Sequence, residues 1–183
     1  MKIAEFGNTI LRQKARKLTV AEIKSPKTRK IIKEMQQFLI SKKMGVGLAA
    51  PQVGEDMALA VISIRPKKNR EEAEEFDLVI INPEITEVHG RRKQEWEGCI
   101  SGGALKSGLF AKVPRYKKVK LKYRDEKGKL HHKTFEGLPA HVIQHEVDHL
   151  EGILFVDKVK DTKTFITYGE YMKLAKALKE KSI

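Results

Sequence analysis

Three histidines recur every four residues in the stretch HVIQHEVDHLEG, which runs from His141 to Gly152. Local signals place the stretch on a helix, because Pro139 stands near its start and Gly152 just past its end. A helix rises about 1.5 Å per residue, so side chains four apart lie about 6 Å apart on one face. Neighbouring histidines can therefore share one metal ion, whereas His141 and His149, about 12 Å apart, cannot. The chain must fold so that further ligands meet this helix.

The metal-binding pair is either the first two or the last two histidines, and Glu146 favours the last two. In HEVDH the glutamate directly follows His145, which points it toward an open coordination position. There it can take a proton from a water molecule and pass it to a leaving amine. The equivalent place after His141 is Val142. We therefore expect His145 and His149 to bind the metal and His141 to be a pocket or surface residue. Accidental spacing of surface histidines is less favoured in a helix that also carries apolar residues for packing.

A catalytic metal site usually has three protein ligands and one open position. Downstream of HEVDH there is no histidine, and the acidic candidates are Glu151, Glu170 and Glu180. Upstream, in EWEGCISGG, lies the single cysteine, Cys99, beside glycines that suggest a specific backbone path. A set of one thiolate and two imidazoles suits Zn²⁺ or Fe²⁺. The residues alone leave the third ligand open between Cys99 and a downstream glutamate.

Patterns elsewhere in the chain predict both helices and strands. Ser25 and Pro26 open an amphipathic helix, and MALAVISI and FDLVIINPEI predict strands. VKLKYRDEKGKLHHKTF predicts a hairpin that turns at residues 125–128. The stretch GVGLAAPQVG, residues 45–54, is expected to be an irregular loop because it is rich in glycine. A last helix is expected from about Thr164 to Glu180.

This order of elements predicts the α+β class, with antiparallel or mixed β-sheets packed around a central metal-binding helix and a C-terminal helix. At 183 residues the chain is long enough for one domain with a core. We expect a single catalytic domain over residues 1–183, with the C-terminal helix at about 162–183.

The composition indicates where the protein is located and which kinds of partner it can bind. No apolar run approaches membrane-spanning length, the N-terminus does not resemble a secretory signal, and one cysteine cannot form an internal disulfide. These features favour a cytoplasmic protein without a membrane partner. The net charge of +13 suggests an anionic partner, with nucleic acid the first candidate, or else a lysine-rich solubilising surface. The lysines are scattered and form no recognised nucleic-acid motif, so both interpretations stay open.

Three motifs together resemble the signature of the peptide deformylases: GVGLAAPQ (45–52), EGCIS (97–101) and HEVDH (145–149). They occur in the same order as in that family and at similar spacing, and the resemblance runs from about Asn8 to Val159. It implies an enzyme that removes the formyl group from the N-terminal methionine of newly made chains and releases formate.

The resemblance also implies roles for particular residues. Cys99, His145 and His149 would be the ligands of one divalent metal ion, typically Fe²⁺ in this family, with Zn²⁺ and other ions also found. Glu146 would be the general base and then the general acid. Gln52, through its amide, and Ile100, through its backbone N–H, would donate to the formyl oxygen.

By the same resemblance, five residues would bind the peptide substrate. Gly45 and Gly47 would expose backbone that pairs with an extended chain. Val46, Leu138 and Val142 would line a pocket for the methionine side chain, although ordinary core packing explains each of them equally well.

Other positions extend the comparison or depart from it. Asp148 is expected to form an ion pair, with Arg115 as the candidate partner. The residues at 102–103, two glycines, replace the apolar residue and proline that are usual in the family, and Phe110 stands near the place of a common arginine. We expect these two departures to affect substrate reach.

The C-terminal helix resembles that of a deformylase subgroup that docks on the ribosome. Lys173, Lys176 and Lys179 lie on one stripe of this helix and suit a phosphate-rich surface. A solvated helix face explains the stripe equally well.

Two other functions compete with deformylation. HEVDH alone is compatible with a zinc endopeptidase, in which Cys99 would not be needed to retain the metal. The basic charge is compatible with a ribosome- or RNA-binding module that has a non-catalytic metal site. Intact Gln52, Cys99, His145, Glu146 and His149 argue against the second alternative.

Overall fold

The computed structural model describes residues 1–41, 45–66, 74–103 and 108–180, with the side chains of 178–180 left out. Within these ranges, none of the helices combines the length and the apolar character needed to cross a bilayer.

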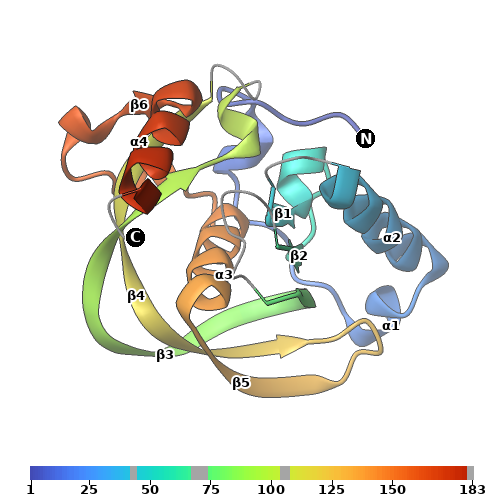
Figure 1. Ribbon diagram of the computed structural model, residues 1–183. Coiled ribbons are helices and arrows are strands. Elements are labelled where there is room, and N and C mark those ends of the chain that lie inside the picture. The colour runs from blue at the N-terminus through green and yellow to red at the C-terminus, as the bar shows by residue number, and fades with distance from the viewer. Residues whose placement is uncertain (42–44, 67–73, 104–107, 181–183) are drawn as a thin grey trace.

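One six-stranded sheet forms the framework of the molecule (Figure 1). All of its paired strands run antiparallel. Five strands follow one another in sequence order, and β6 pairs with β4. The strands are β1 (Gly47–Ala49), β2 (Leu59–Ile64), β3 (Phe76–Gly98), β4 (Leu109–Arg124), β5 (Leu130–Glu136) and β6 (Ile166–Thr167).

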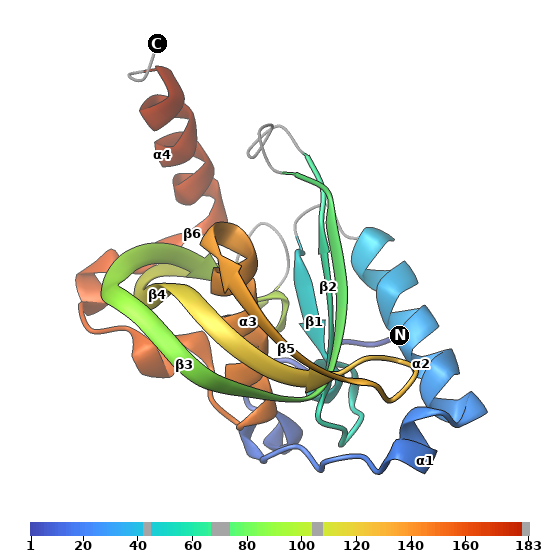
Figure 2. The same ribbon diagram turned by 90° about the horizontal axis from the view of Figure 1, so that it is seen from below.

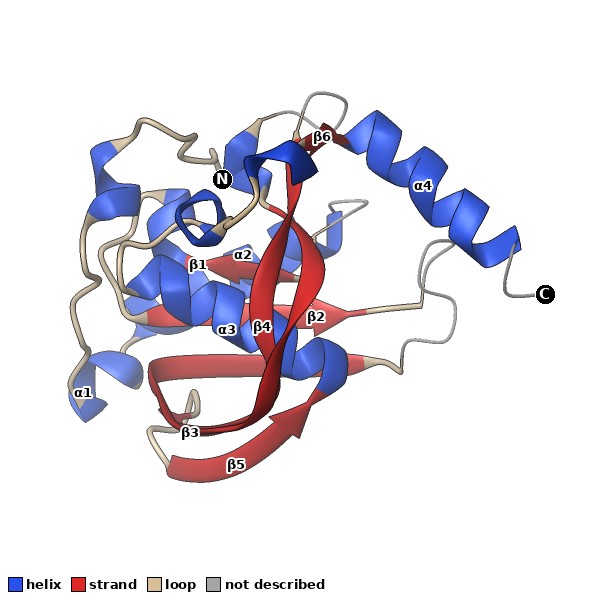
Figure 3. Cartoon of the chain, turned by 90° about the vertical axis from the view of Figure 1, so that its left-hand side faces the viewer, coloured by secondary structure: helices blue, strands red, loops and turns tan. Residues whose placement is uncertain are grey.

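Strand β3 is 23 residues long and joins the two halves of the sheet. Its first part pairs with β2 and the remainder pairs with β4, with register shifts after Ile81, Ile85 and His89. Such irregularities bend a strand and increase its twist. β3, β4 and β5 therefore curve around a helix instead of forming a flat layer (Figures 2 and 3).

That enclosed helix is α3 (Gly137–Leu150), which carries the HEVDH sequence. Val142, Ile143 and Leu150 are buried in a core cluster shared with the sheet. A second core cluster lies between the sheet and α2 (Pro26–Ser41), whose first turn is capped by Ser25. Two apolar layers therefore hold β1 and β2 between α2 and α3.

The remaining elements are short, apart from the C-terminal helix α4 (Tyr168–Glu180), which extends away from the sheet (Figure 2). In the described ranges they are the helix α1 (Val20–Ile23) and five 3₁₀ turns: η1 (Thr9–Arg12), η2 (Ala50–Val53), η3 (Ile100–Gly102), η4 (Phe155–Lys158) and η5 (Thr162–Thr164).

The predicted α+β class, the amphipathic helix opened by Ser25 and Pro26, and the hairpin are confirmed. The hairpin turns at Asp125, whose carbonyl accepts from the N–H of Gly128 at 2.9 Å. α3 begins and ends as the positions of Pro139 and Gly152 predicted. Both predicted strands are present, although β3 continues well beyond its predicted end.

Two local predictions were wrong. Residues 45–54 are not an irregular loop, because Gly47–Ala49 pairs with β2 and Ala50–Val53 forms a 3₁₀ turn. Tertiary pairing here overrides the weak intrinsic preference of glycine for strands. The last helix begins at Tyr168 rather than near Thr164, because the preceding residues pair with β4 as β6.

Candidate metal centre and active site

Cys99, His145 and His149 meet at one point, where the end of β3 approaches α3. Their ligand atoms all lie within 4.8 Å of one another, and the Sγ of Cys99 lies 3.2 Å from Nε2 of His149. Donors around a tetrahedral metal with bonds of 2.0–2.3 Å lie roughly 3.5 Å apart. The three residues therefore fit a divalent ion with at most a small contraction of the site.

The downstream glutamates do not complete this cluster. Glu170 lies on α4 and accepts from Lys173 at 2.7 Å, and Glu151 pairs with Lys14 at 2.6 Å. The side chain of Glu180 lies outside the described part. Of the candidates considered for the third position, Cys99 is the one that lies beside the two histidines.

Glu97 contacts the ring nitrogen of His145 that does not face the metal position, a role that the sequence analysis missed. It is 4% exposed, and its Oε2 lies 2.9 Å from Nδ1 of His145. This contact leaves Nε2 of His145 free to face the metal position. A carboxylate behind a metal-binding histidine fixes the orientation of its ring. The signal was present in the sequence, because Glu97 precedes Cys99 by two residues in extended chain, where alternate side chains share a face.

His141 also contacts Glu97, a contact that the sequence analysis did not predict. Its Nε2 lies 2.7 Å from Oε1 of Glu97. Burial by itself would raise the pKa of Glu97, but hydrogen bonds from Arg115, His141 and His145 outweigh burial and lower it. Glu97 is therefore a stable anion next to the metal position.

The predicted ion pair between Asp148 and Arg115 is confirmed. Nη1 of Arg115 donates to Asp148, while Nε and Nη2 donate to the two oxygens of Glu97. Lys158 adds a second cation to Asp148, with its Nζ 2.8 Å from Oδ1. Arg115 therefore joins the strand that ends just before Cys99 to the helix that carries both histidines.

Glu146 lies on α3 with its carboxylate turned into the site. It is 2% exposed, and among the described residues its Oε2 has no hydrogen-bond partner. Burial raises its pKa to about 7, although the neighbouring His145 and His149 oppose the shift. A carboxyl group with such a pKa can both accept and release a proton near neutral pH.

The surroundings of Cys99 favour its thiolate form. Burial by itself would raise the pKa of this thiol, but the charge on His149 and the hydrogen bond from His145 outweigh burial and lower it strongly. The thiolate is the form of cysteine that binds metal. The hydrogen bonds of His145 to Cys99 and Glu97 outweigh its own burial and raise its pKa. A metal ion that binds here must therefore displace a proton from His145.

Gln52 brings an amide donor to the same place. Its Oε1 accepts from the N–H of Ala49 at 2.8 Å, which fixes the side chain so that Nε2 faces the other way. Nε2 lies 3.2 Å from Oγ of Ser101 and 3.3 Å from Sγ of Cys99. Ile100 opens the η3 turn directly after Cys99, and the first N–H groups of a helical turn have no partner within it.

The two glycines before Gln52 pack directly against these groups. A Cβ atom on Gly47 would lie 2.1 Å from Oε1 of Glu146, and one on Gly45 would lie 2.9 Å from Cδ1 of Ile100. Gly47 must therefore lack a side chain if Glu146 is to keep its place.

The other three expected substrate residues are more scattered. Val142 is 4% exposed in a core cluster against which Val46 packs. Leu138 is 38% exposed, and it lies two helical turns before His145, in a separate hollow beside Phe76.

The departures from the family pattern lie at one border of the site. The ring of Phe110 covers Gly98, where a Cβ atom would lie 2.5 Å from it. The same ring stacks on Tyr171 of α4 with centroids 4.5 Å apart. An aromatic contact between β4 and α4 therefore stands near the place of the family arginine. Gly103 has φ +118°, a conformation that favours glycine.

Comparisons with known proteins agree with this geometry. The family model for polypeptide deformylase matches residues 1–165. A peptide deformylase of Leptospira biflexa is 39% identical over 166 residues, which cover 90% of each chain. One from Aquifex aeolicus is 38% identical over 177 residues, 97% of this chain and 98% of that one.

Solved structures show the same likeness. A class I type b peptide deformylase from Acinetobacter baumannii, bound to Met-Ala-Ser, superposes with a TM-score of 0.80 at 33% identity and covers 87% of this chain and 98% of that one. An actinonin complex of the Synechococcus elongatus enzyme has a TM-score of 0.76 at 36% identity, with coverages of 90% and 81%. The chain therefore belongs to the peptide deformylase family.

Proposed function

We propose that this protein is a metal-dependent hydrolase that removes the N-formyl group from the N-terminal methionine of nascent polypeptides and releases formate. One observation supports this most directly: the free carboxylate oxygen of Glu146 is buried beside a Cys/His/His ligand set. Membership of the family supplies the substrate class. The comparisons support neither the endopeptidase nor the RNA-binding alternative.

In this proposal Cys99, His145 and His149 hold one divalent ion. When bound, the ion supplies Lewis-acid activation of water and of the formyl oxygen. Glu146 accepts the proton of the attacking water at Oε2 and then delivers it to the leaving amine nitrogen. Its pKa of about 7 suits both steps.

Charge that develops on the formyl oxygen is stabilised by Nε2 of Gln52 and the backbone N–H of Ile100. Gln52 is held in place by its bond to Ala49, so its donor needs little reorganisation during the reaction. Loss of one such donor commonly costs about 3 kcal/mol of barrier.

The peptide is expected to lie along β1, the edge strand of the sheet. An edge strand presents unpaired backbone groups to which an extended chain can add. Gly45 and Gly47 would expose that backbone, and Val46, Leu138 and Val142 would line the methionine pocket. A neighbour with Met-Ala-Ser bound shows that a related enzyme accepts a methionine peptide.

The decisive experiment measures formate release from a formyl-Met peptide by the full chain, loaded with Fe²⁺ under anaerobic conditions. Exclusion of air matters because a ligating thiolate can be oxidised. Turnover is expected, together with a loss of roughly 10²–10⁴-fold in Glu146→Gln. Absence of formate at full metal loading, or cleavage of unformylated internal peptides instead, would overturn the proposal.

The resident ion is proposed to be Fe²⁺, with Zn²⁺ or another divalent ion able to occupy the same ligands. Metal analysis of protein purified without air tests this point. A protein that carries zinc alone, and is as active as its iron-loaded form, would contradict it.

We also propose that the protein is cytoplasmic and that it contacts the ribosome through α4. Lys173 and Lys176 lie on this helix, although Lys173 already pairs with Glu170 at 2.7 Å. Lys179 belongs to the same helix, with a side chain outside the described part. Changing all three lysines to glutamate should abolish salt-sensitive co-sedimentation with ribosomes. Unchanged co-sedimentation would remove the contact from the proposal.

A further inference from the structure

A second hollow lies beside α3, separate from the metal centre. Its volume is about 280 Å³, and its walls come from β3, β4, α3 and the segment around η4. Cys99, His145 and His149 are not among its lining residues in the described part of the chain. The catalytic proposal therefore does not account for this pocket.

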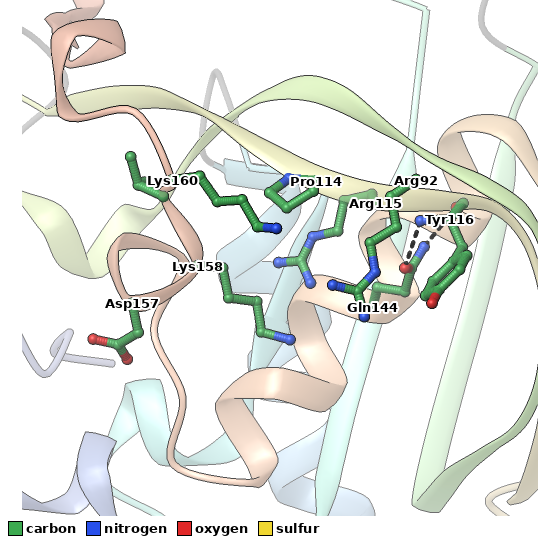
Figure 4. Close-up of a pocket in the computed structure, with 9 residues that line it drawn as sticks. Arg92, Pro114, Arg115, Tyr116, Gln144, Asp157, Lys158 and Lys160 are labelled. Carbon is green, nitrogen blue, oxygen red and sulfur yellow. Dashed lines mark hydrogen bonds between the residues drawn. The ribbon is translucent and has the colours of Figure 1, made fainter.

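Four cationic side chains line it: Arg92, Arg115, Lys158 and Lys160. Figure 4 shows their charged ends directed toward the same space from different segments of the chain. Like charges that converge repel one another, and the repulsion is reduced when an anion lies between them.

The carboxylates nearby do not balance this charge. Arg115 shares Glu97 and Asp148, and Lys158 adds its charge to the same Asp148. Asp157 also borders the pocket, but it pairs with Arg12 and points away from the cations (Figure 4).

Of these four cations, Arg92 and Lys160 are the two without a carboxylate partner in the described part of the chain. Among the described residues, no carboxylate lies within 4.0 Å of either one, whereas Arg92 lies over the ring of Tyr116 at 4.9 Å. The pocket therefore has a surplus of positive charge.

Arg115 gives the pocket a fixed, buried donor. Its side chain is 3% exposed, and bonds to Glu97 and Asp148 use three of the five N–H groups of a guanidinium. Two N–H groups have no partner among the residues that the structure describes and remain for a ligand. Gln144 fixes the adjacent wall, because it accepts from the N–H of Tyr116 at 3.0 Å and donates to its carbonyl at 2.8 Å.

We propose that this pocket binds a phosphate-type oxyanion, either free phosphate or the phosphate group of a small monoester. Such an anion carries up to two negative charges and several acceptor oxygens. These match the forked geometry of arginine and the point charge of lysine. The proposal is independent of the deformylase activity, because it depends on residues outside the metal centre.

Phosphate binding can be followed by ³¹P NMR on the zinc-loaded, diamagnetic full chain. Inorganic phosphate and glycerol 2-phosphate serve as separate probes of the two sources. The test variant is Arg92→Gln/Lys160→Gln, which removes the two cations without a carboxylate partner. The matched control is Arg29→Gln/Lys33→Gln, which removes the same charges from the exposed face of α2.

Saturable binding is expected below about 10 mM for at least one probe, and the test variant should weaken it about tenfold or more. The control variant should bind as the unmodified chain does. Equal zinc content and melting temperature in both variants show that folding is intact. Equal affinity in all three proteins would place the anion elsewhere, for example at the metal, and would overturn the proposal. Absence of saturable binding in the unmodified chain would overturn it as well.

Discussion

At the scale of single residues, the close approach of Gly47 to Glu146 limits which side chain position 47 can carry. Glu146, the proposed general base, lies on a helix and Gly47 lies on an edge strand, and the carboxylate occupies the space that a side chain at position 47 would fill. The carboxylate is also buried without a partner on one oxygen, which keeps it reactive and raises its pKa. Both properties come from packing around a single side chain.

Gly47→Ala is expected to lower kcat/KM for a formyl-Met peptide by roughly 10²–10⁴-fold, because the new methyl group displaces the carboxylate of Glu146. Steady-state kinetics with equal metal loading measure the loss. The control is Gly45→Ala, whose methyl group would meet only the movable ends of Leu39 and Ile100. Equal losses in the two variants would contradict the special role of Gly47.

The raised pKa of Glu146 predicts a pH dependence of stability in the metal-free protein. Between the usual value of 4.5 and the folded value of about 7, the folded chain holds a proton that the unfolded chain has released. Stability from this group is therefore lost as the pH rises through that window. Glu146→Gln lacks the titration.

The unmodified chain should lose stability from this group between pH 5 and pH 8, whereas Glu146→Gln should not. The difference in unfolding free energy between the two proteins should therefore shift by on the order of 2 kcal/mol in favour of the variant over this range. Denaturant unfolding at both pH values measures the difference. Parallel pH profiles for the two proteins would show that Glu146 does not titrate in this range.

At the scale of elements, the C-terminal end of α3 is set by Gly152. Its φ is +74°, its N–H donates to the carbonyl of His149 at 3.2 Å, and the N–H of Ile153 donates to Asp148 at 2.9 Å. This arrangement satisfies the last carbonyls of the helix. It also turns the chain against the backbone of Arg12, so that the helix carrying both histidines is anchored at its end.

Gly152→Ala should lower the unfolding free energy by more than about 2 kcal/mol. The left-handed conformation costs an alanine about 1–2 kcal/mol. In addition, the new Cβ atom would lie 2.7 Å from the carbonyl oxygen of Arg12. Gly90→Ala is the matched control, with φ +78° and no atom within 4 Å of the added Cβ. Chemical denaturation of both variants separates the two costs. A loss at Gly152 no larger than that at Gly90 would show that the contact with Arg12 relaxes freely.

At the scale of the whole molecule, Arg115 joins the parts that must meet for a metal centre to exist. It extends from β4 to Glu97 on β3 and to Asp148 on α3, and the side chains of Arg115 and Glu97 are each 3% exposed. Removal of one partner from a buried ion network leaves uncompensated charge, which is far more costly than the loss of an exposed pair.

Arg115→Met should therefore lower the unfolding free energy by about 3–5 kcal/mol and weaken metal binding roughly 10–100-fold. Denaturant unfolding and competition with a chelator measure the two effects. Arg12→Met, which removes an exposed pair with Asp157, is the control and should cost less than about 1 kcal/mol. Retained metal affinity in Arg115→Met would separate the ion network from the metal centre.

Features with a short-range cause could be predicted from the sequence alone. The helix that carries HEVDH, with Pro139 near its start and Gly152 just past its end, follows from local signals, and the pairing of His145 with His149 follows from helical geometry, which acts over a few residues. The turn at 125–128 is equally local. Similarity to the family supplied Cys99 as the third ligand, a choice that the residues themselves had left open.

Only the tertiary structure decided how distant segments meet. Glu97 reaches His145 across 48 residues, Gly47 lies against Glu146 although the two are far apart in the sequence, and residues 47–49 become a strand because β2 lies beside them. The cationic pocket beside α3 likewise needs four separate segments. Such contacts depend on how strands bend and helices pack, and no periodicity within one segment contains that information.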